Sequence, residues 1–194
     1  MHARVIFLKR LSKNYWLLQL TKPEGLNFKA GQYISLKVHP DGHRRSYSLS
    51  DPPSSSHMNL LADVSPMGLG SKYILSLHPG SLVDFIGPLG KFIKTSDGLF
   101  LAGGSGIAPF LSMRAGPILW SLHRKSEVFD TGLNPLIFYT RDFLTQYLKS
   151  IQDLKKLSYL SLWEPPLCLR HDKITYFPWC YFHSTSRRKI RLMC

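Results

Sequence analysis

The order of short strand-like segments is the feature that most constrains the fold of this chain. Alternating apolar and polar residues, separated by turns that contain glycine, proline or asparagine, predict strands at 5–8, 15–20, 32–38, 43–50, 58–64 and 82–86. Residues 70–78 have helical spacing instead. Six short strands with one helix favour a closed antiparallel β-barrel, because closure leaves no exposed sheet edge.

The pattern changes at Leu99. Residues 99–102 are fully apolar, as in a buried parallel strand, and a glycine turn and a helix from Ile107 follow them. A second apolar strand is expected at 136–139, followed by an amphipathic helix at 143–157. This β-α-β-α order predicts the beginning of a doubly wound parallel α/β domain.

A glycine–proline pair interrupts this second region. Pro117 should end or bend the helix that begins at Ile107, because proline has no N–H and clashes with the preceding turn. The helix is therefore short or kinked, or an insertion begins here. Residues 94–98 are polar and contain Gly98, and they are the expected boundary between the two regions.

Composition and charge narrow the function classes. With 44% hydrophobic residues the chain is globular, and the lack of a run of about 18 apolar residues predicts no membrane span. The N-terminus lacks the apolar core of a signal peptide, so a cytoplasmic location is expected. The net charge of +13 suits anionic ligands and acidic protein partners. No nucleic-acid motif accompanies it, so we predict no nucleic-acid partner.

The segment His43–Ser50 combines a fixed cation, an aromatic ring and hydroxyl groups. Arg45 and Tyr47 are two residues apart, so in a strand their side chains point to the same face. A guanidinium binds phosphate oxygens through paired N–H groups, and a phenol ring offers a stacking surface. The segment suits a ligand that is part phosphate and part flat ring; the alternative is an exposed strand with polar side chains.

Two glycine-containing segments suit phosphate binding. Gly68-Leu69-Gly70-Ser71 precedes the predicted helix of the barrel, and residues 103–109 follow the first apolar strand. Glycine lets the backbone approach a phosphate closely, and a helix N-terminus offers free N–H groups. The alternatives are an ordinary N-cap at Ser71 and a purely structural glycine turn at 103–106. The second segment also departs from the G-x-G-x-x-G dinucleotide pattern.

Taken together, three motifs resemble the ferredoxin–NADP reductase family of flavoproteins. They are Arg-x-Tyr-Ser at 45–48, Gly-Pro-x-Gly-x-Phe at 87–92 and Gly-Gly-x-Gly-Ile-Ala-Pro at 103–109. The resemblance covers roughly residues 1–141. It implies a six-stranded flavin-binding barrel at 1–96 and an NAD(P)-binding α/β domain at 97–194, which is incomplete or divergent after about residue 142.

The resemblance also implies a flavin site. In it, Arg45 contacts the pyrophosphate of FAD, Tyr47 packs on the isoalloxazine ring, and Ser48 donates a hydrogen bond near N5, the atom that receives the hydride. Tyr47 and Ser48 are therefore the candidate catalytic residues. The full set of residues expected to bind flavin is Arg45, Ser46, Tyr47, Ser48, Gly68, Gly70 and Ser71.

The pyridine-nucleotide site implied by the resemblance follows the first apolar strand. Its expected residues are Gly103, Gly104, Gly106, Ile107, Ala108 and Pro109, together with Thr140 and Arg141 after the second strand. An arginine at 141 could meet the 2′-phosphate of NADP, which favours NADP over NAD. An ordinary surface arginine is the alternative.

The implied function is a flavin-dependent oxidoreductase that passes a hydride from NAD(P)H to FAD, and electrons onward to an iron–sulfur or haem partner. The C-terminal region departs from the family, because Tyr181 follows Cys180 where the family has Cys-Gly, and no terminal aromatic residue is present. The alternatives are therefore a flavin-binding module with impaired hydride transfer, and a non-catalytic interaction domain. The choice between FAD and FMN stays open.

The three cysteines all lie in the last 27 residues, at 168, 180 and 194. Two of them form Cys-x-x-His pairs with His171 and His183, a spacing also found in zinc sites. The residues between the pairs are bulky and lack a turn glycine, so we expect free thiols and no bound metal.

Overall fold

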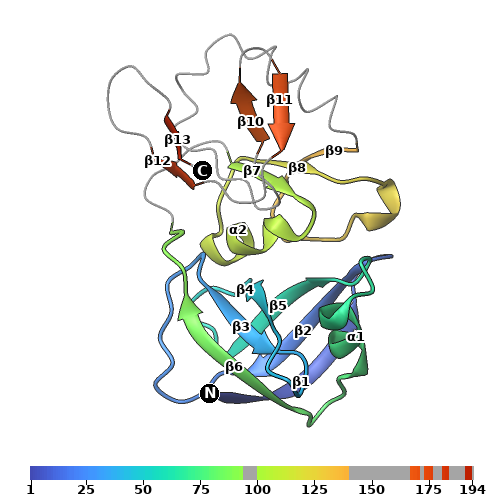
Figure 1. Ribbon diagram of the computed structural model, residues 1–194, viewed down its shortest axis with the longest axis vertical. Coiled ribbons are helices and arrows are strands. Elements are labelled where there is room, and N and C mark those ends of the chain that lie inside the picture. Colours follow the sequence, from blue (N-terminus) through green and yellow to red (C-terminus); the bar gives the residue numbers. More distant parts are fainter. Residues whose placement is uncertain (94–99, 140–166, 171–172, 177–180, 184–190, 194) are drawn as a thin grey trace.

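The computed structural model describes residues 1–93 and 100–139, with the backbone of four further short strands. These are β10 (Leu167–Arg170), β11 (Lys173–Tyr176), β12 (Tyr181–His183) and β13 (Arg191–Met193). β10 pairs with β11 and β12 with β13, both antiparallel. Figure 1 shows the N-terminal sheet at one end of the molecule and the second sheet beside it.

Residues 1–93 form the predicted antiparallel barrel. Its strands are β1 (His2–Arg10), β2 (Tyr15–Thr21), β3 (Tyr33–Lys37), β4 (Arg44–Ser48), β5 (His57–Asp63) and β6 (Leu82–Leu89). They pair in the order β4-β3-β6-β1-β2-β5, and a bridge between Leu49 and Leu60 joins the two outer strands. Helix α1 (Leu69–Ser76) connects β5 to β6. The predicted six strands and single helix are confirmed.

Alternation along the strands builds the core of the barrel. In β2 and β3, for example, Leu18, Leu20, Ile34 and Leu36 are buried while the residues between them face outward. From the side, Ile74 of α1 enters the same core. Because every second residue of a strand points inward, this pattern fixes the register of each strand as well as its position.

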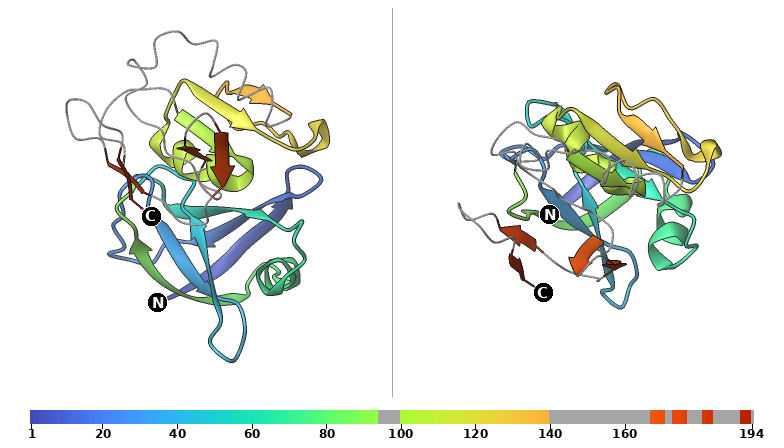
Figure 2. Two further views of the ribbon diagram at one scale, coloured as in Figure 1. Left: turned by 45° about the horizontal axis from the view of Figure 1, so that its top comes forward. Right: turned by 90° about the horizontal axis from the view of Figure 1, so that it is seen from above.

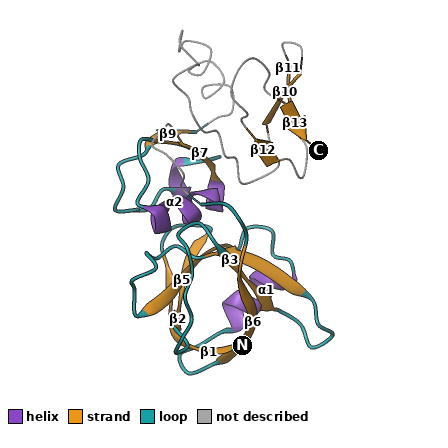
Figure 3. Cartoon of the chain, turned by 90° about the vertical axis from the view of Figure 1, so that its left-hand side faces the viewer, coloured by secondary structure: helices purple, strands orange, loops and turns teal. Residues whose placement is uncertain are grey.

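Residues 100–139 form a smaller parallel sheet. Its strands are β7 (Phe100–Gly103), β8 (Ile118–Ser121) and β9 (Leu136–Phe138), adjacent in that order. The 3₁₀ turn η1 (Gly104–Ile107) and helix α2 (Ala108–Met113) connect β7 to β8, and the 3₁₀ turn η2 (Lys125–Glu127) precedes β9. Figure 3 shows α2 between this sheet and the barrel. The expected partial parallel α/β half is thus confirmed.

The second half differs from the sequence prediction in the position of its second strand. We expected residues 136–139 to follow the first helix directly, but β8 lies between β7 and β9. Pro117 immediately precedes β8, where its missing N–H costs no ladder hydrogen bond. The helix is short, as expected, and ends at Met113 because Arg114 has a left-handed backbone conformation with φ 47°.

A single apolar core joins the barrel to the parallel sheet. Tyr15 of β2 and Leu61 of β5 pack in one cluster with side chains of the second half, among them Phe100, Ile107, Phe110 and Trp120. The turn after β8 also lies beside the β1–β2 hairpin (Figures 1 and 2), where the amide of Lys13 donates to the carbonyl of Ser126 at 3.1 Å. The two halves are therefore held by both apolar and polar contacts.

Two predictions fall outside the described residues: the boundary at 94–98, which lies between β6 and β7, and the helix at 143–157. Among the helices that the structure describes, none is long and apolar enough to cross a membrane.

The barrel core leads to a stability prediction. Leu18→Ala should lower the free energy of unfolding by about 2–5 kcal/mol, because a fully buried leucine leaves a cavity when it is truncated. Leu82→Ala is the matched control, since Leu82 is 58% exposed and should change stability by less than about 0.5 kcal/mol. Urea denaturation measures both values; equal losses would mean that β2 does not face the core.

Candidate functional site

Arg45 and Tyr47 lie on one face of β4 and converge on the first turn of α1. Both residues are opposite buried residues of β3, Tyr47 across from Ile34 and Arg45 across from Leu36. A Cβ atom added to Gly70 would lie 2.8 Å from the Tyr47 hydroxyl and 3.0 Å from Cγ of Arg45. A side chain at this point would require Tyr47 or Arg45 to shift, so the predicted common face of Arg45 and Tyr47 is confirmed and Gly70 permits their close approach.

The two adjacent arginines of β4 have different partners. Arg44 donates to the carbonyl of Ser35 and forms an ion pair with Asp84, and its hydrogen bond holds the pKa of Asp84 below its usual value. Arg45 is exposed and donates only to the carbonyl of Arg44, with no carboxylate partner among the described residues. Its guanidinium therefore remains available for an anion.

Burial shifts the titration of Tyr47 to higher pH. Burial raises the pKa of its phenol to about 12, against the smaller opposing effect of the Arg45 charge. Burial also raises the pKa of the neighbouring Tyr73 on α1. The Tyr47 hydroxyl carries its proton at neutral pH with or without this shift and can donate a hydrogen bond, while the ring packs against the barrel core.

The N-terminus of α1 has no side-chain cap. Gly68 occupies the N-cap position in an extended conformation, without a side-chain hydrogen bond, so the expected alternative of an N-cap at Ser71 is wrong. No acidic side chain lies in the first turn. The backbone N–H groups of this turn therefore have no carboxylate of the helix that competes for them, and Gly70 of the same turn lies beside Arg45.

The remaining predicted flavin residues divide between surface and interior. Ser46 is exposed, whereas Ser48 and Ser71 are buried. Ser48 is paired with Tyr33 across the β4–β3 ladder, on the face opposite to Tyr47. The strand thus presents a cation and a ring on one side and a buried hydroxyl on the other.

The Gly-Pro-x-Gly-x-Phe motif lies where the barrel meets the second half. A Cβ atom on Gly90 would lie 2.9 Å from the ring of Tyr33, so this glycine also permits a close approach. Two residues later, Phe92 packs edge-on against Phe110 of α2, with ring centroids 5.8 Å apart. The motif therefore helps to attach α2 to the barrel.

The predicted nucleotide segment forms a turn between β7 and α2. Gly104 adopts φ 51°, in the left-handed region that favours glycine. Its carbonyl accepts a hydrogen bond from the indole nitrogen of Trp120 on β8 at 2.9 Å. A Cβ atom on Gly103 would meet no atom within 4 Å, so the turn is open on that side.

The other predicted nucleotide residues of this segment are buried. Gly106, Ile107, Ala108 and Pro109 all have little exposed surface, and Ile107 and Ala108 belong to the core shared with the barrel. Gly103, Gly104 and Ser105 remain partly exposed. Thr140, Arg141 and the side chains of the two Cys-x-x-His pairs lie outside the described residues.

Asp51, which the sequence indicated only as part of a turn, connects the two predicted sites. It follows β4, and its backbone carbonyl accepts a hydrogen bond from the buried hydroxyl of Ser112 on α2 at 2.6 Å. Its carboxylate accepts a bond from Asn59 at 2.9 Å and lies 3.5 Å from His57. Burial raises the pKa of this carboxyl, while His57 lowers it. Only the position of Asp51 directly after the Arg-x-Tyr-Ser strand could have indicated this role.

Comparisons with known proteins agree with this geometry. The family model for the oxidoreductase FAD-binding domain matches residues 2–93. The chain is 33% identical over 135 residues to a flavohemoprotein of Halalkalibacterium halodurans, covering 62% of this chain and 33% of that protein. It is 32% identical over 136 residues to ferredoxin–NADP reductase B of Sorangium cellulosum, covering 62% and 56% of the two chains.

A solved structure extends the likeness to the second half. Phthalate dioxygenase reductase matches 84% of this chain and 59% of its own, with a TM-score of 0.63 and 18% identity, which shows a common fold. In sequence, the chain spans about a third of the flavohemoprotein and about half of the Sorangium cellulosum reductase.

Tyr47→Phe should reduce the loss of stability at alkaline pH. The pKa of Tyr47 is 10.0 in its ordinary state and about 12 in the fold, so between these values the unfolded chain loses the phenol proton and the folded chain keeps it. The free energy of unfolding therefore falls as pH rises through this window, by about 1.4 kcal/mol per unit. Urea midpoints across the window measure the effect, and parallel curves for wild type and variant would contradict it.

Proposed function

We propose that residues 2–93, which match the family model for an oxidoreductase FAD-binding domain, bind FAD, and that the chain acts as an oxidoreductase that passes a hydride from NAD(P)H to FAD. Electrons then continue to an iron–sulfur or haem partner. The observation that carries this proposal is the convergence of Arg45 and Tyr47 on Gly70 at the uncapped N-terminus of α1.

The described residues fit the flavin. The guanidinium of Arg45 and the N–H groups at the N-terminus of α1 offer the positive potential that a pyrophosphate needs, and Gly70 lets Arg45 and Tyr47 pack against that turn. We assign the ring of Tyr47 to packing on the isoalloxazine and Ser48 to a hydrogen bond near its N5. Ser46, Gly68 and Ser71 complete this set. Bound FAD would supply the hydride acceptor and release electrons one at a time.

The nucleotide is assigned to the segment from Gly103 to Pro109. Because Ile107 and Ala108 are buried in the shared core, we assign nucleotide contacts here to the backbone at Gly103 and Gly104, with the buried Gly106, Ile107, Ala108 and Pro109 holding it in place. Asp51 and Ser112 connect this segment to the flavin strand. Thr140 and Arg141 stay predictions for the ribose contact, and with them the preference for NADP.

Relatives support the choice of partner. One relative is named a ferredoxin–NADP reductase, and the structure of phthalate dioxygenase reductase is described as modular for electron transfer from pyridine nucleotides to [2Fe-2S]. We propose the same kind of electron-transfer partner for the present chain. The cytoplasmic location and the division into domains at 1–96 and 97–194 also stay predictions.

Arg45→Ala should weaken FAD binding by roughly ten- to a hundredfold. Removing the guanidinium leaves the pyrophosphate charge without its partner, and one charge-assisted hydrogen bond contributes about 1.5–3 kcal/mol. Titration of the apoprotein with FAD, followed by quenching of tryptophan fluorescence, measures the affinity.

Arg44→Ala is the matched control for this experiment. Arg44 is the neighbouring residue on the same strand, but Asp84 and the Ser35 carbonyl already engage its guanidinium. It should lose stability and keep its FAD affinity within about twofold. Equal weakening in both variants would mean that general charge, rather than the face of β4, attracts the flavin.

Anaerobic mixing of the FAD-loaded protein with NADPH separates the proposed function from its alternatives. Bleaching of the flavin absorbance at the rates usual for enzymes, ~1–10³ per second, is the expected result. Flavin binding with slow or no bleaching would favour a flavin-binding module with impaired hydride transfer. A protein that binds no flavin would leave only the interaction domain.

A further inference from the structure

Trp120 makes a contact that the proposed function does not use. It lies fully buried on β8, in register with Ala102 of β7, and its indole N–H donates to the carbonyl of Gly104 at 2.9 Å. Gly104 is the one residue of the turn with a left-handed backbone, so this bond acts on the peptide that gives the turn its shape. The direction of one carbonyl also limits where the neighbouring N–H groups can point.

The segment that carries Trp120 is attached to the barrel at its other end. The ring of Phe129 lies edge-on to Trp120, with centroids 5.1 Å apart, and 5.5 Å from the ring of Tyr15 on β2. The three rings form a continuous buried path from the glycine turn to the barrel. Packed aromatic rings resist displacement because each is held in place by its neighbours.

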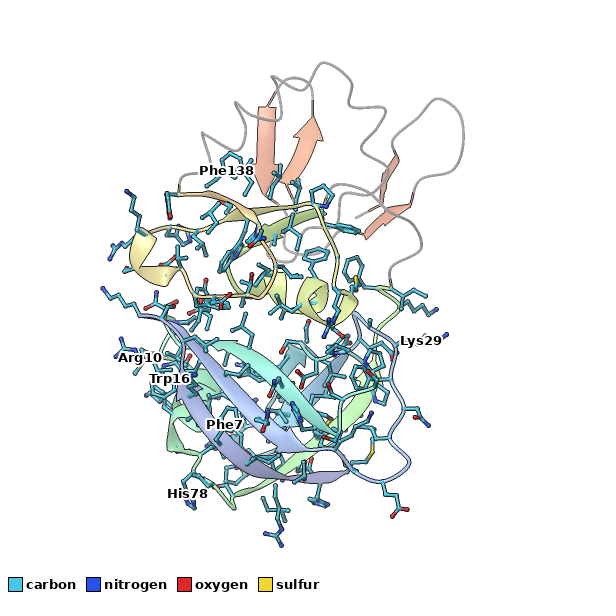
Figure 4. All side chains as sticks on the ribbon, turned by 180° about the vertical axis from the view of Figure 1, so that it is seen from behind. Phe7, Arg10, Trp16, Lys29, His78 and Phe138 are labelled. Carbon is cyan, nitrogen blue, oxygen red and sulfur yellow. The ribbon has the colours of Figure 1, made fainter. Side chains whose placement is uncertain are left out.

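Polar contacts run parallel to the aromatic path. The buried carboxylate of Glu127 accepts hydrogen bonds from the Asn14 side chain at 3.2 Å and from the amides of His123 and Arg124 at 3.0 and 3.4 Å. The amide of Lys13 donates to the carbonyl of Ser126 at 3.1 Å. Arg10, labelled in Figure 4, braces the same hairpin by donating to the carbonyls of Ser12 and Lys13.

We propose that residues 118–129 form a clamp that positions the Gly103–Gly106 turn against the barrel, with Trp120 as the positioning residue at the turn. The effect of this clamp on nucleotide binding rests on the proposed function. The flavin strand is part of the barrel, so a clamp anchored on Tyr15 and Asn14 sets the turn in the same frame as the flavin. Trp120 itself is fully buried, so we assign it no contact with either cofactor.

A positioning role and ordinary core packing predict different effects when Trp120 is replaced. A tryptophan that only fills space would lower global stability when replaced, with no particular effect on the turn. If Trp120 positions the turn, its replacement should loosen the backbone of residues 104–108 and leave the barrel unchanged. Trp120→Phe separates the two, because phenylalanine keeps an aromatic ring beside Phe129 and removes the N–H donor together with part of the indole.

The first measurement needs no cofactor. Native-state hydrogen exchange of the amides in residues 104–108 should be about tenfold faster in Trp120→Phe than in wild type, with exchange in β2 and β5 unchanged. Trp16→Phe makes the same chemical change on the barrel, where Figure 4 labels Trp16, and should leave the turn unaffected. Unchanged exchange at 104–108 in Trp120→Phe, or the same increase in Trp16→Phe, would overturn the clamp.

Asn14→Ala tests the clamp from the barrel side and replaces Trp120→Phe if that variant does not fold. It removes the donor to Glu127 without touching the glycine turn. Faster exchange at 104–108 supports the clamp, and exchange equal to wild type contradicts it.

Nucleotide affinity gives the functional readout. In the FAD-loaded protein, Trp120→Phe should raise the Kd for NADPH by about tenfold and leave the FAD affinity within about twofold. If wild-type protein binds no NADPH, the proposed function fails, and the exchange experiment still decides whether the clamp exists. If wild type binds NADPH and the variant binds it equally well, the clamp does not position the nucleotide site.

Discussion

The apolar core shared by the barrel and the parallel sheet is the constraint on which the rest of the site depends. Tyr15 and Leu61 belong to barrel strands, yet they pack with Ile107, Phe110 and Trp120 of the second half. Burying apolar surface between two halves opposes their relative motion, because separation would expose that surface to water. Strand β4 and the Gly103–Gly106 turn are consequently held in one frame.

Within this frame, the adjacent residues Arg44 and Arg45 of β4 make different interactions. Arg44 is engaged by Asp84 and stabilises the barrel, whereas Arg45, on the opposite face, has no carboxylate partner among the described residues. Period-two alternation makes this division possible, because neighbouring side chains of a strand never compete for the same partner. The close approach at Gly70 then brings the free guanidinium to the uncapped end of α1.

The sequence predicted the barrel strands, the helix and the Arg45–Tyr47 face well, because alternation and turn residues are local signals. It missed β8, since the short run Ile118-Leu119-Trp120 becomes a strand only by pairing with β7 and β9. The polar connections were equally invisible: Ser112 and Asp51 are 61 residues apart, and Asn14 and Glu127 are 113 apart. Such contacts depend on the assembled fold, which no local pattern records.

Burial of Ile107 and Ala108 explains why the shape of the glycine turn matters so much. Side chains that fill the shared core cannot also reach a ligand at the surface, so the nucleotide recognition that we propose at this turn falls on backbone N–H groups. Backbone groups cannot change rotamer to improve a contact, and their directions are set only by φ and ψ. The hydrogen bond from Trp120 to the carbonyl of Gly104 therefore acts on the backbone conformation of the turn, which sets the directions of these N–H groups.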